Sequence, residues 1–387
     1  MRIEILVGAS EFWNRLAGDL AGARQRAWVQ TLSFEGDSAG TQLADAMLAC
    51  PAPDRRILID DYTRYWLSDR FLYSPSALMD PELRAEARAT RSMIAALRAG
   101  GVDARFVSRL GFLFRRLPAR DHKKIVLIDG DVAYIGGINF SDHNFAWHDL
   151  MLRIEHADVA EFLRNDLLAT WHGHASPARA NFEGMELLSL DGADNESTLA
   201  DVIALLAGAE EHVAVHNAYT TFPFCDALRE AAGRGVRVTV ITPDVNNRGF
   251  MRDYMVWESA RSGFELMLYP GRMSHLKAVL VDGRRLITGS SNFDWLTYTY
   301  QPEILAVIDR PDVIEAFRTR VLDPDLEAST PADGRGDLRR GRNAYLMMRA
   351  LAKVGRFVCP AERRPHAPAA FSAARAGSQP AASRPAA

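Results

Sequence analysis

Two segments of the sequence carry the same polar residues at the same spacing. "HKKIVLIDGDVAYIGGIN" begins at residue 122 and "HLKAVLVDGRRLITGSSN" at residue 275, and the two align without a gap. The matched residues are His122, Lys124, Asp129, Gly136 and Asn139 in the first copy, and His275, Lys277, Asp282, Gly289 and Asn292 in the second. One such pattern could arise by chance, but two in register predict one shared site.

Lysine is rare in this chain, so its recurrence in both copies is informative. Of the 46 basic residues, only Lys123, Lys124, Lys277 and Lys353 are lysines. A lysine ammonium is a compact charge with three rotatable donors and suits a tetrahedral phosphodiester, whereas the arginine fork is broader. We therefore predict that Lys124 and Lys277 hold phosphate oxygens. Lys123 would point to the opposite face of its strand, and we assign it no catalytic role.

The two histidines could divide the work of a phosphodiester reaction. One would act as nucleophile and the other as general acid and then base, with pKa values set differently by nearby carboxylates. Two lysines supply the charge compensation that Mg²⁺ gives in other phosphoryl-transfer sites, and no carboxylate cluster of the two-metal kind stands near them in the sequence. The sequence therefore predicts chemistry at His122 and His275 without a metal or other cofactor.

Buried strands must position these residues. Residues two apart on a strand share a face, so the histidine and lysine of each copy would project together. The runs "IVLI" and "AVLV" that follow them are typical of buried strands, and a Gly-rich turn then brings each asparagine back. We predict that Asn139 and Asn292 bind the substrate, as do the small turn residues Gly137 and Ser290.

The elements around the two copies also repeat, which predicts an α/β fold of two similar halves. In the first half we expect strands at 27–34, 55–61, 102–108 and 123–129, with helices at 40–50 and 89–101. In the second half we expect strands at 211–219, 236–243, 264–270 and 276–282, with helices at 225–235 and 253–263. If the halves pack about a pseudo-two-fold axis, both motifs converge on one cavity between them.

The expected boundaries follow from composition. "LDGADNEST", residues 190–198, is rich in turn formers, so we divide the chain into a first half at 1–190 and a second half at 191–330. Residues 331–387 would hold a basic helix and a disordered tail, because the Ala/Pro/Ser/Arg-rich end of the chain can bury little apolar surface.

Charge and cysteine content bound the setting. The formal net charge of −3 gives no global attraction to nucleic acid, and we expect no nucleic-acid partner. Three scattered cysteines favour a reducing compartment. With no apolar run long enough to span a membrane and no signal-peptide pattern, we expect a monomer in the cytoplasm, peripheral to the inner face of the cell membrane. Five further histidines lack a metal-ligand spacing, and we interpret them as solvated or hydrogen-bonded: His143, His148, His156, His172 and His174.

The paired H-x-K-x4-D pattern, each followed by a Gly-Gly or Gly-Ser turn and Asn, resembles the phospholipase D superfamily over about residues 25 to 320. Within that superfamily the chain is most similar to the cardiolipin synthase-like branch. The segments that carry this similarity are "GGINFSDHN", "WHDLMLRIEHADV", "NAYTTFP", and "GSSNFD" followed by "QPEI". The resemblance implies two α/β/α halves related by a pseudo-two-fold axis, with the active site between them.

The resemblance also implies roles for individual residues. His122 would form a phosphohistidine, His275 would protonate the leaving alcohol, and Asp129 and Asp282 would each orient a histidine. Three further residues match positions of the branch and are predicted to bind the substrate: Asp149, Tyr219 and Glu303. The implied reaction is phosphatidyl transfer on phosphatidylglycerol or another glycerophospholipid.

Two departures leave alternatives open. Leu296 and Thr297 stand where the branch commonly has Arg-Ser, and many relatives begin with membrane spans that this sequence lacks. A phospholipase D that hydrolyses phospholipids to phosphatidic acid, a phosphodiesterase or nuclease, and a non-catalytic phospholipid-binding module are the alternatives. A nuclease would favour a basic groove with stacking aromatics, and a binding module would favour a broken motif.

Two further segments could contact lipid. "RLGFLFRRLPARD", residues 109–121, mixes Phe, Leu and Arg, and is either a lip that touches headgroups or an ordinary packed loop. "LRRGRNAYLMMRALAKVGRF", residues 338–357, combines six basic residues with an apolar face. Basic amphipathic helices lie on anionic membranes, so this segment is predicted either to bind such a surface or to pack on its own domain with a solvated basic face.

Overall fold

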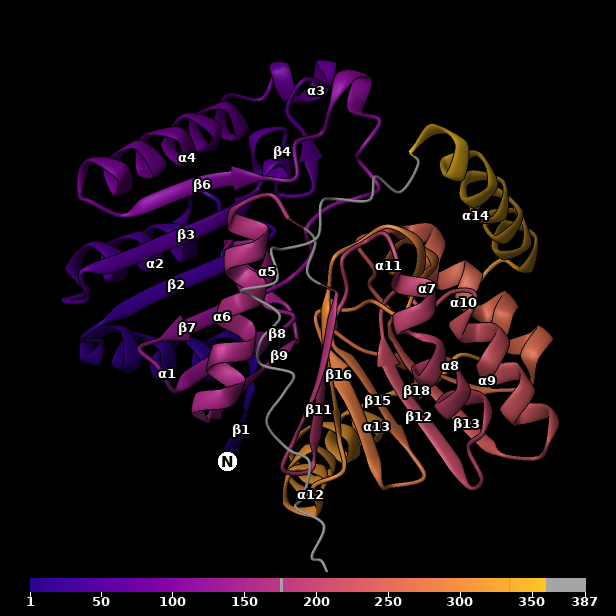
Figure 1. Ribbon diagram of the computed structural model, residues 1–387. Helices are drawn as coiled ribbons and strands as arrows, with labels where there is room; N and C mark the ends of the chain where they lie inside the picture. The colour runs from indigo at the N-terminus through magenta and orange to yellow at the C-terminus, as the bar shows by residue number, and fades with distance from the viewer. Residues whose placement is uncertain (175–176, 334, 360–387) are drawn as a thin grey trace, which may run out of the picture.

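The protein consists of two α/β halves that lie side by side, as the computed structural model in Figure 1 shows. The structure describes residues 1–174, 177–333 and 335–359. The tail predicted to be disordered begins within residues 331–387, and its part from 360 onward lies outside the described residues. Among the residues described, no helix is both long and apolar enough to cross a bilayer.

Each half is built on a mixed sheet, and the two sheets share one strand order. In the first, six consecutive strands run β9 (Leu150–Glu155), β8 (Val132–Gly136), β7 (Ile125–Ile128), β2 (Arg26–Thr31), β3 (Asp54–Asp60) and β6 (Asp103–Val107). In the second they run β17 (Ile304–Ile308), β16 (Arg285–Gly289), β15 (Lys277–Val281), β12 (His212–Asn217), β13 (Arg237–Pro243) and β14 (Glu265–Tyr269). This correspondence confirms the predicted fold class, including every strand and helix expected around the two motifs.

Further strands extend the edges of both sheets. They are β1 (Arg2–Val7) beside β9, β10 (Ala178–Phe182) and β11 (Met185–Ser189) beside β17, and β18 (Thr330–Pro331) beside β14. Strands β10 and β11 precede the boundary expected at residue 190, yet they pair with the second sheet. The alternating pattern of β10 is that of a half-buried strand, but it carries no information on which sheet the strand joins.

Helices flank both sheets. In the first half they are α1 (Gly8–Gly22), α2 (Ser38–Ala49), α4 (Pro81–Ala99) and α6 (Ala157–Trp171). In the second half they are α8 (Ala200–Ala207), α9 (Phe224–Gly233), α10 (Gly249–Ser262), α12 (Pro311–Phe317) and α13 (Asp323–Ala328). Helix α4 shows why they form: Asp80 caps its first N–H groups, Pro81 fits the first turn, and apolar residues three to four apart face the sheet.

Both motif strands are fully buried, and a common core joins the halves. Every residue of β7 and β15 is buried. One hydrophobic cluster contains Leu127 and Leu152 from the first half together with Leu280 and Ile304 from the second. Removing such a buried leucine costs about 2–5 kcal/mol, so the halves form a rigid frame for the residues at their junction.

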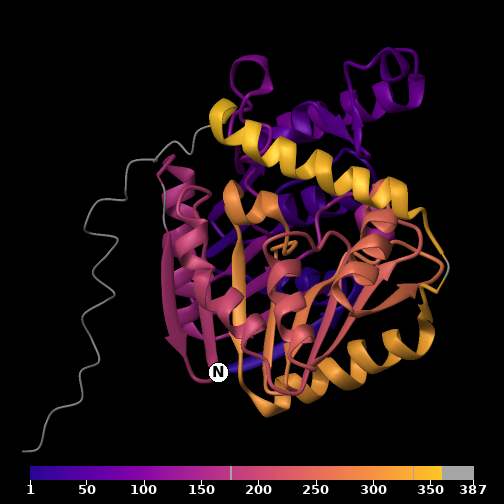
Figure 2. The same cartoon turned by 90° about the vertical axis from the view of Figure 1, so that its right-hand side faces the viewer.

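The first half contains an excursion for which the second has no matching elements in the described chain. Between β3 and α4 lie η1 (Asp61–Arg64), β4 (Trp66–Leu67), β5 (Arg70–Phe71) and α3 (Pro75–Leu78), and η2 (Phe112–Phe114) follows β6. At the other end of the chain, α14 (Leu338–Val358) packs along α10, as Figures 1 and 2 both show. The remaining short elements are α5 (Asp142–Ala146), α7 (Asn195–Thr198), α11 (Trp295–Thr299) and η3 (Arg318–Leu322).

Candidate active site

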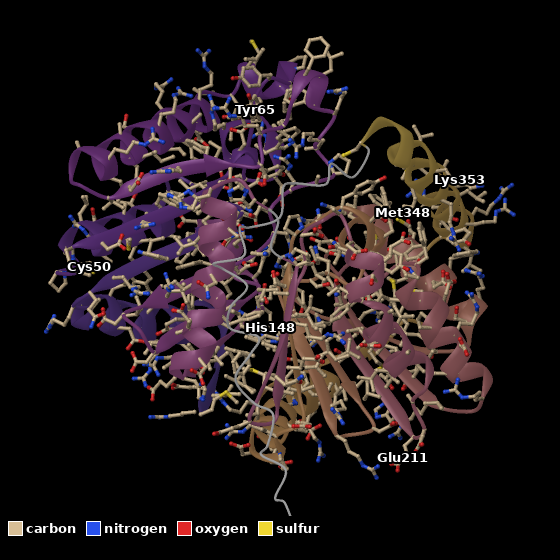
Figure 3. All side chains as sticks on the ribbon, in the orientation of Figure 1. Cys50, Tyr65, His148, Glu211, Met348 and Lys353 are labelled. Atoms are coloured by element: carbon tan, nitrogen blue, oxygen red, sulfur yellow. The ribbon has the colours of Figure 1, made fainter. Side chains whose placement is uncertain are left out.

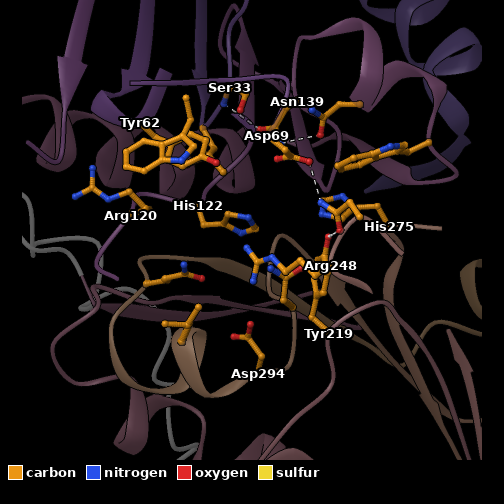
Figure 4. A pocket seen from close by; sticks show the side chains of 18 of the residues that line it. Ser33, Tyr62, Asp69, Arg120, His122, Asn139, Tyr219, Arg248, His275 and Asp294 are labelled. Carbon is orange, nitrogen blue, oxygen red and sulfur yellow. Dashed lines mark hydrogen bonds between the residues drawn. The ribbon is translucent and has the colours of Figure 1, made fainter. Parts of the chain in front are cut away.

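A cavity of about 370 Å³ lies between the two halves and is lined by residues from both motifs. His122 and Asn139 reach it from the first half, and His275 and Asn292 from the second. Figure 4 shows the two histidines facing each other across this space. The predicted convergence of the two motifs on one cavity is thus what the structure contains.

His122 is held so that one ring nitrogen faces the protein and the other is available. Its backbone N–H donates to the Pro302 carbonyl at 3.0 Å, which ties the first motif to the second half. Its Nδ1 lies 2.8 Å from Glu303 Oε1 and 3.1 Å from the Ser290 carbonyl oxygen. Because a carbonyl only accepts, Nδ1 carries the proton and Nε2 keeps its lone pair. Burial and the charges of Lys124 and Lys277 hold the pKa of His122 well below its ordinary value, so the ring is neutral.

His275 has a related environment with a different carboxylate. Its backbone N–H donates to the His148 carbonyl at 2.7 Å, and its Nδ1 lies 2.8 Å from Asp149 Oδ2. Burial and the Lys277 charge lower the pKa of His275 to about 3. Burial alone would raise the pKa of Asp149, but Lys277 and the His275 hydrogen bond outweigh it and lower that pKa, so Asp149 is ionised.

Each histidine therefore takes its carboxylate from the opposite half. Asp149 directly precedes β9 and Glu303 directly precedes β17, and these strands occupy equivalent places in the two sheets. Burial raises the pKa of Glu303 to about 7, although Lys124 opposes this rise. One carboxylate is thus a fixed negative charge, and the other changes its charge near neutral pH.

The small turn residues make room for these carboxylates. A Cβ at Gly137 would lie 2.3 Å from both carboxylate oxygens of Asp149, so only glycine fits there. Ser290 donates its hydroxyl to Glu303 at the equivalent position. Neither residue lines the cavity, and their predicted contact with substrate stays a prediction. Both act on the carboxylates, which in turn hold the histidine rings.

The motif lysines lie beneath the histidines. Lys124 Nζ donates to the His122 carbonyl at 2.7 Å, and Lys277 Nζ donates to the His275 carbonyl and lies 3.5 Å from Asp149 Oδ2. Burial lowers the pKa of Lys124 to about 7 and also lowers that of Lys277. Lys123 points away from the site, as predicted, and binds Asp166 at 2.6 Å.

The motif aspartates do not orient the histidines, so that prediction is wrong. Asp129 accepts backbone N–H groups of residues 24–26, and Asp282 accepts those of residues 210–212. Both follow their strands with positive φ, 51° and 50°, and anchor the turn there. Seven residues of extended chain span roughly 20 Å, which puts these carboxylates at the far end of the strand from the histidines.

Amide and aromatic side chains complete the wall. Asn139 is fixed by hydrogen bonds to Thr31 and Asn144 at 3.2 Å each, whereas the buried Asn292 Oδ1 has no hydrogen-bond partner among the residues described. The Tyr219 ring lies edge-on to His275 with centroids 5.9 Å apart, and its hydroxyl donates to Asn247. Tyr219 and the two asparagines therefore line the cavity, and their binding of substrate stays a prediction.

Sequence reasoning missed three features of this site. The Trp147 ring packs 4.9 Å from that of His275, and Arg248, whose guanidinium lies 5.0 Å from the Tyr219 ring, also lines the cavity. Behind Asp149, Asp325 binds His148 Nε2 at 2.8 Å. Trp147 stands two residues before Asp149 in the segment "WHDLMLRIEHADV", so the sequence offered a signal for it, but Arg248 and Asp325 belong to no repeated pattern.

One acidic group in the described chain is close enough to hold a cation. Glu35, Asp37 and Glu86 lie together in the first half. Burial raises the pKa of Glu35 to about 9, so this carboxyl carries a proton at neutral pH. A proton on Glu35 removes one of the three negative charges of this group. We assign the group no part in the chemistry at the two histidines.

Comparison with known proteins gives one consistent family. A family model described as a cardiolipin synthase, PLD-like domain, matches residues 16–171 and 202–322. The chain is 27% identical to cardiolipin synthase B of Shigella flexneri over 341 residues, covering 79% of this chain and 76% of that protein. It is 22% identical over 365 residues to a probable cardiolipin synthase, YwiE, of Bacillus subtilis, covering 88% of this chain and 69% of that protein.

Among solved structures, the fold is similar to that of phosphatidylserine synthase from Haemophilus influenzae. The TM-score is 0.68 at 16% sequence identity, and the match covers 92% of this chain and 94% of the other. At this identity the match shows the fold. The family model ends at residue 322, so Asp325 and helix α14 lie beyond it.

Proposed function

The chain belongs to the cardiolipin synthase, phospholipase D-like family, and from this premise we propose that it transfers a phosphatidyl group from one phosphatidylglycerol to another. The observation that carries the proposal is the pair of neutral histidines on one cavity, each bound through Nδ1 to a carboxylate from the opposite half. Such a pair presents both Nε2 atoms to the same phosphorus. That arrangement suits double displacement through a covalent intermediate.

In the first step, His122 Nε2 attacks phosphorus and the bond from phosphorus to the glycerol oxygen breaks. His275 donates a proton to that oxygen, and glycerol leaves. The Asp149 charge and the bound phosphodiester both favour protonated His275, which opposes the causes that lower its pKa in the empty site. Lys124, Lys277, Asn139 and Asn292 stabilise the charge that builds on the phosphoryl oxygens.

In the second step, the phosphohistidine at His122 is attacked by a hydroxyl of a second phosphatidylglycerol. His275, now neutral, takes the proton of that hydroxyl as the new oxygen–phosphorus bond forms and the nitrogen–phosphorus bond breaks. The products are cardiolipin and a regenerated His122. Water in place of the second lipid would give phosphatidic acid, so what reaches the intermediate decides between transfer and hydrolysis.

We also propose that the protein works as a monomer at the inner face of the cell membrane. One chain supplies both histidines of the cavity and, next to them, both lysines and both carboxylates, so the site needs no residue from a second copy. With both motifs complete, a purely binding role leaves the paired histidines without a purpose.

The test is to incubate the purified protein with phosphatidylglycerol vesicles and a chelator, and to resolve the lipids by mass spectrometry. We expect cardiolipin and free glycerol in equal amounts, and neither with His122→Ala. Phosphatidic acid as the sole product would replace transfer with hydrolysis. If no product depends on His122, the lipid assignment is wrong, and phosphatidylethanolamine and single-stranded DNA are the next substrates to test.

A further inference from the structure

The excursion of the first half carries an exposed apolar tip. We call the loop 108–119 and the segment 61–80 the aromatic lip. Phe112 and Leu113 are 76% and 77% exposed, and Met79 in the neighbouring segment is 84% exposed. Soluble surfaces seldom show several such side chains together unless they contact another apolar phase.

The lip has a firm base beneath this tip. The Phe114 ring packs against the rings of Tyr65, Trp66 and Phe71, with centroids 5.4, 5.9 and 5.7 Å apart. Leu113 and Phe114 both have left-handed backbones, with φ of 52° and 57°, which such side chains rarely adopt. The loop is thus held in a costly conformation that presents its apolar tip to solvent, and such strain persists where the surroundings impose it.

Positive charge surrounds the tip. The exposed arginines Arg109 and Arg115 stand on either side of the Phe-Leu-Phe sequence. Apolar side chains between basic residues match the surface of an anionic bilayer, in which acyl chains lie under negatively charged headgroups.

Helix α14 repeats this composition in the second half. Its inner face packs on α10, closely enough that a Cβ at Gly341 would lie 2.2 Å from the Asp253 carbonyl oxygen. Its outer face exposes apolar side chains on successive turns, namely Leu346, Met347, Leu351 and Val354. The helix contains six basic residues and no acidic ones. The segment therefore packs on its own half, as one prediction had it, and still presents a basic, apolar face to solvent.

The lip lines the cavity, and α14 lies beside the segment around α11, which lines the cavity as well. Tyr62 and Trp66 of the lip line the cavity directly. Gly355 of α14 lies against Tyr300, which ends α11, and Leu296 of α11 lines the cavity. Figures 1 and 2 both place α14 and the loops around α3 at one end of the molecule, and Figure 3 shows Tyr65 and Lys353 there and Glu211 at the other.

We infer that the aromatic lip and the outer face of α14 together form a docking surface for an anionic lipid bilayer, with the cavity opening between them. A second copy of the chain is a poorer occupant, because it would bring arginines against arginines. The effect of docking on catalysis, unlike docking itself, rests on the proposed function. A docked cavity would receive the second lipid from the bilayer and meet little water, which favours transfer over hydrolysis.

The experiment uses two double variants of the full chain at exposed positions, which spare the core. They are Phe112→Asp with Leu113→Asp on the lip, and Met347→Glu with Leu351→Glu on α14. Leu48→Asp is the matched control, because Leu48 is exposed on α2, away from the surface described. Circular dichroism checks that all three fold, and cosedimentation with phosphatidylglycerol or neutral phosphatidylcholine vesicles measures binding.

We expect each double variant to bind phosphatidylglycerol vesicles about 10-fold more weakly or worse, and the control to bind like the parent. The parent should bind neutral vesicles weakly and lose affinity for anionic ones as salt rises. Unchanged binding in either double variant would overturn the two-part surface. So would a parent that is dimeric in solution and becomes monomeric on substitution, because the face would then join two copies.

Activity on a short-chain phosphatidylglycerol, kept below its micelle concentration, separates this inference from the proposed function. Double variants that turn it over at the parental rate but make less cardiolipin on vesicles support both. A parent that binds vesicles through these residues yet transfers no phosphatidyl group leaves the docking surface standing and removes the proposed reaction. Equal loss on soluble and vesicular substrate would overturn docking as the cause.

Discussion

The two halves hold their histidines in the same frame but give them unequal carboxylates. His275 faces Asp149, whose lowered pKa keeps it ionised, whereas His122 faces Glu303, whose pKa burial raises to about 7. A fixed negative charge favours an imidazolium, as a general acid requires. A carboxyl of variable charge, helped by the Ser290 carbonyl, orients a neutral ring, as a nucleophile requires. The proposed roles of nucleophile and general acid therefore follow the difference between the two carboxylates.

The two halves also differ in the buried ion-pair networks that lie behind the histidines and their carboxylates. In the first half, Lys123 next to the motif histidine forms a buried ion pair with Asp166 at 2.6 Å. In the second half, the buried Asp325 carboxylate oxygen Oδ2 lies 2.8 Å from His148 Nε2 and 3.2 Å from His216 Nδ1. The first network is an ion pair of a lysine with one carboxylate, whereas the second joins one carboxylate to two histidines. Both networks adjoin a motif pair in the chain, since Lys123 follows His122 and His148 precedes Asp149, but His148 also gives its backbone carbonyl to the His275 N–H.

The strongest test of the difference between the two halves is to remove each histidine in turn. His122→Ala should lose at least about 10⁴-fold in turnover, because it removes the nucleophile. His275→Ala should lose about 10²–10⁴-fold on phosphatidylglycerol, the usual contribution of general acid–base catalysis. A p-nitrophenyl phosphodiester needs no proton on its leaving group, so His275→Ala should still release a burst of nitrophenol in rapid-mixing experiments.

The burst assigns the roles. It should equal about one nitrophenol per active site in His275→Ala and be missing in His122→Ala, with a phosphohistidine detectable only in the former. A burst in His122→Ala alone would exchange the two assignments. Full activity of either variant on natural lipid would remove the paired-histidine mechanism altogether.

The carboxylates should differ less strongly and in a predictable order. Asp149→Asn removes the charge that supports protonated His275 and should lower kcat about 10²-fold or more. Glu303→Gln should cost only about 10-fold, because the Ser290 carbonyl still accepts the His122 Nδ1–H and keeps Nε2 free. Steady-state kinetics on phosphatidylglycerol would measure both effects, and equal losses would contradict the asymmetry.

The pH dependence distinguishes the same two groups. Glu303 has a raised pKa of about 7, so in the parent kcat/KM should fall as pH drops through 7 and Glu303 gains a proton. Gln cannot titrate, so this decline should vanish in Glu303→Gln. It should remain in Asp149→Asn, since the pKa of Asp149 is already lowered and that group stays ionised throughout this range.

The sequence predicted the two halves and their shared cavity because both signals repeat within one chain. A matched spacing of His, Lys and Asn reports strands of the same length in the same register. The predicted role of the motif aspartates was wrong because spacing is all that the repeat shows. An aspartate follows each motif histidine by seven residues, but the sequence does not show that these seven residues span a whole strand. Asp149 and Glu303 were identified as site residues, yet their crossing to the opposite histidine depends on how the halves pack.

The proposed docking surface and the network around Asp325 were harder to predict from the sequence. The apolar tip at Phe112 and Leu113 fits both a lipid contact and a packed loop, and only the exposed fractions of those side chains separate the two. Asp325 gives no periodic or motif signal at all. Its importance comes from two histidines, 177 and 109 residues away in the chain, that meet it in the folded protein only.

The smallest expected effect concerns those deeper networks, and it separates positioning from stability. Asp325→Asn turns an amide towards His148 and His216 and should loosen the segment that carries Asp149. We expect kcat to fall about 10-fold with KM unchanged, since small misplacements of a catalytic group act on the transition state. Loss of a hydrogen bond to the ionised Asp325 carboxylate costs about 1.5–3 kcal/mol, so thermal stability should fall by less than in a variant that leaves a buried charge unpaired.

Asp166→Asn is the matched variant from the first half, and its pattern should be the reverse. It leaves the Lys123 ammonium buried without its partner, which costs about 3–5 kcal/mol, and the melting temperature should fall by several degrees. Turnover per folded molecule should stay near the parental value, because Lys123 points away from the cavity. Calorimetry and kcat measured on the same samples decide the matter. If Asp325→Asn lowered only stability, its network would be structural like that of Asp166, and the second half would owe its general acid to Asp149 alone.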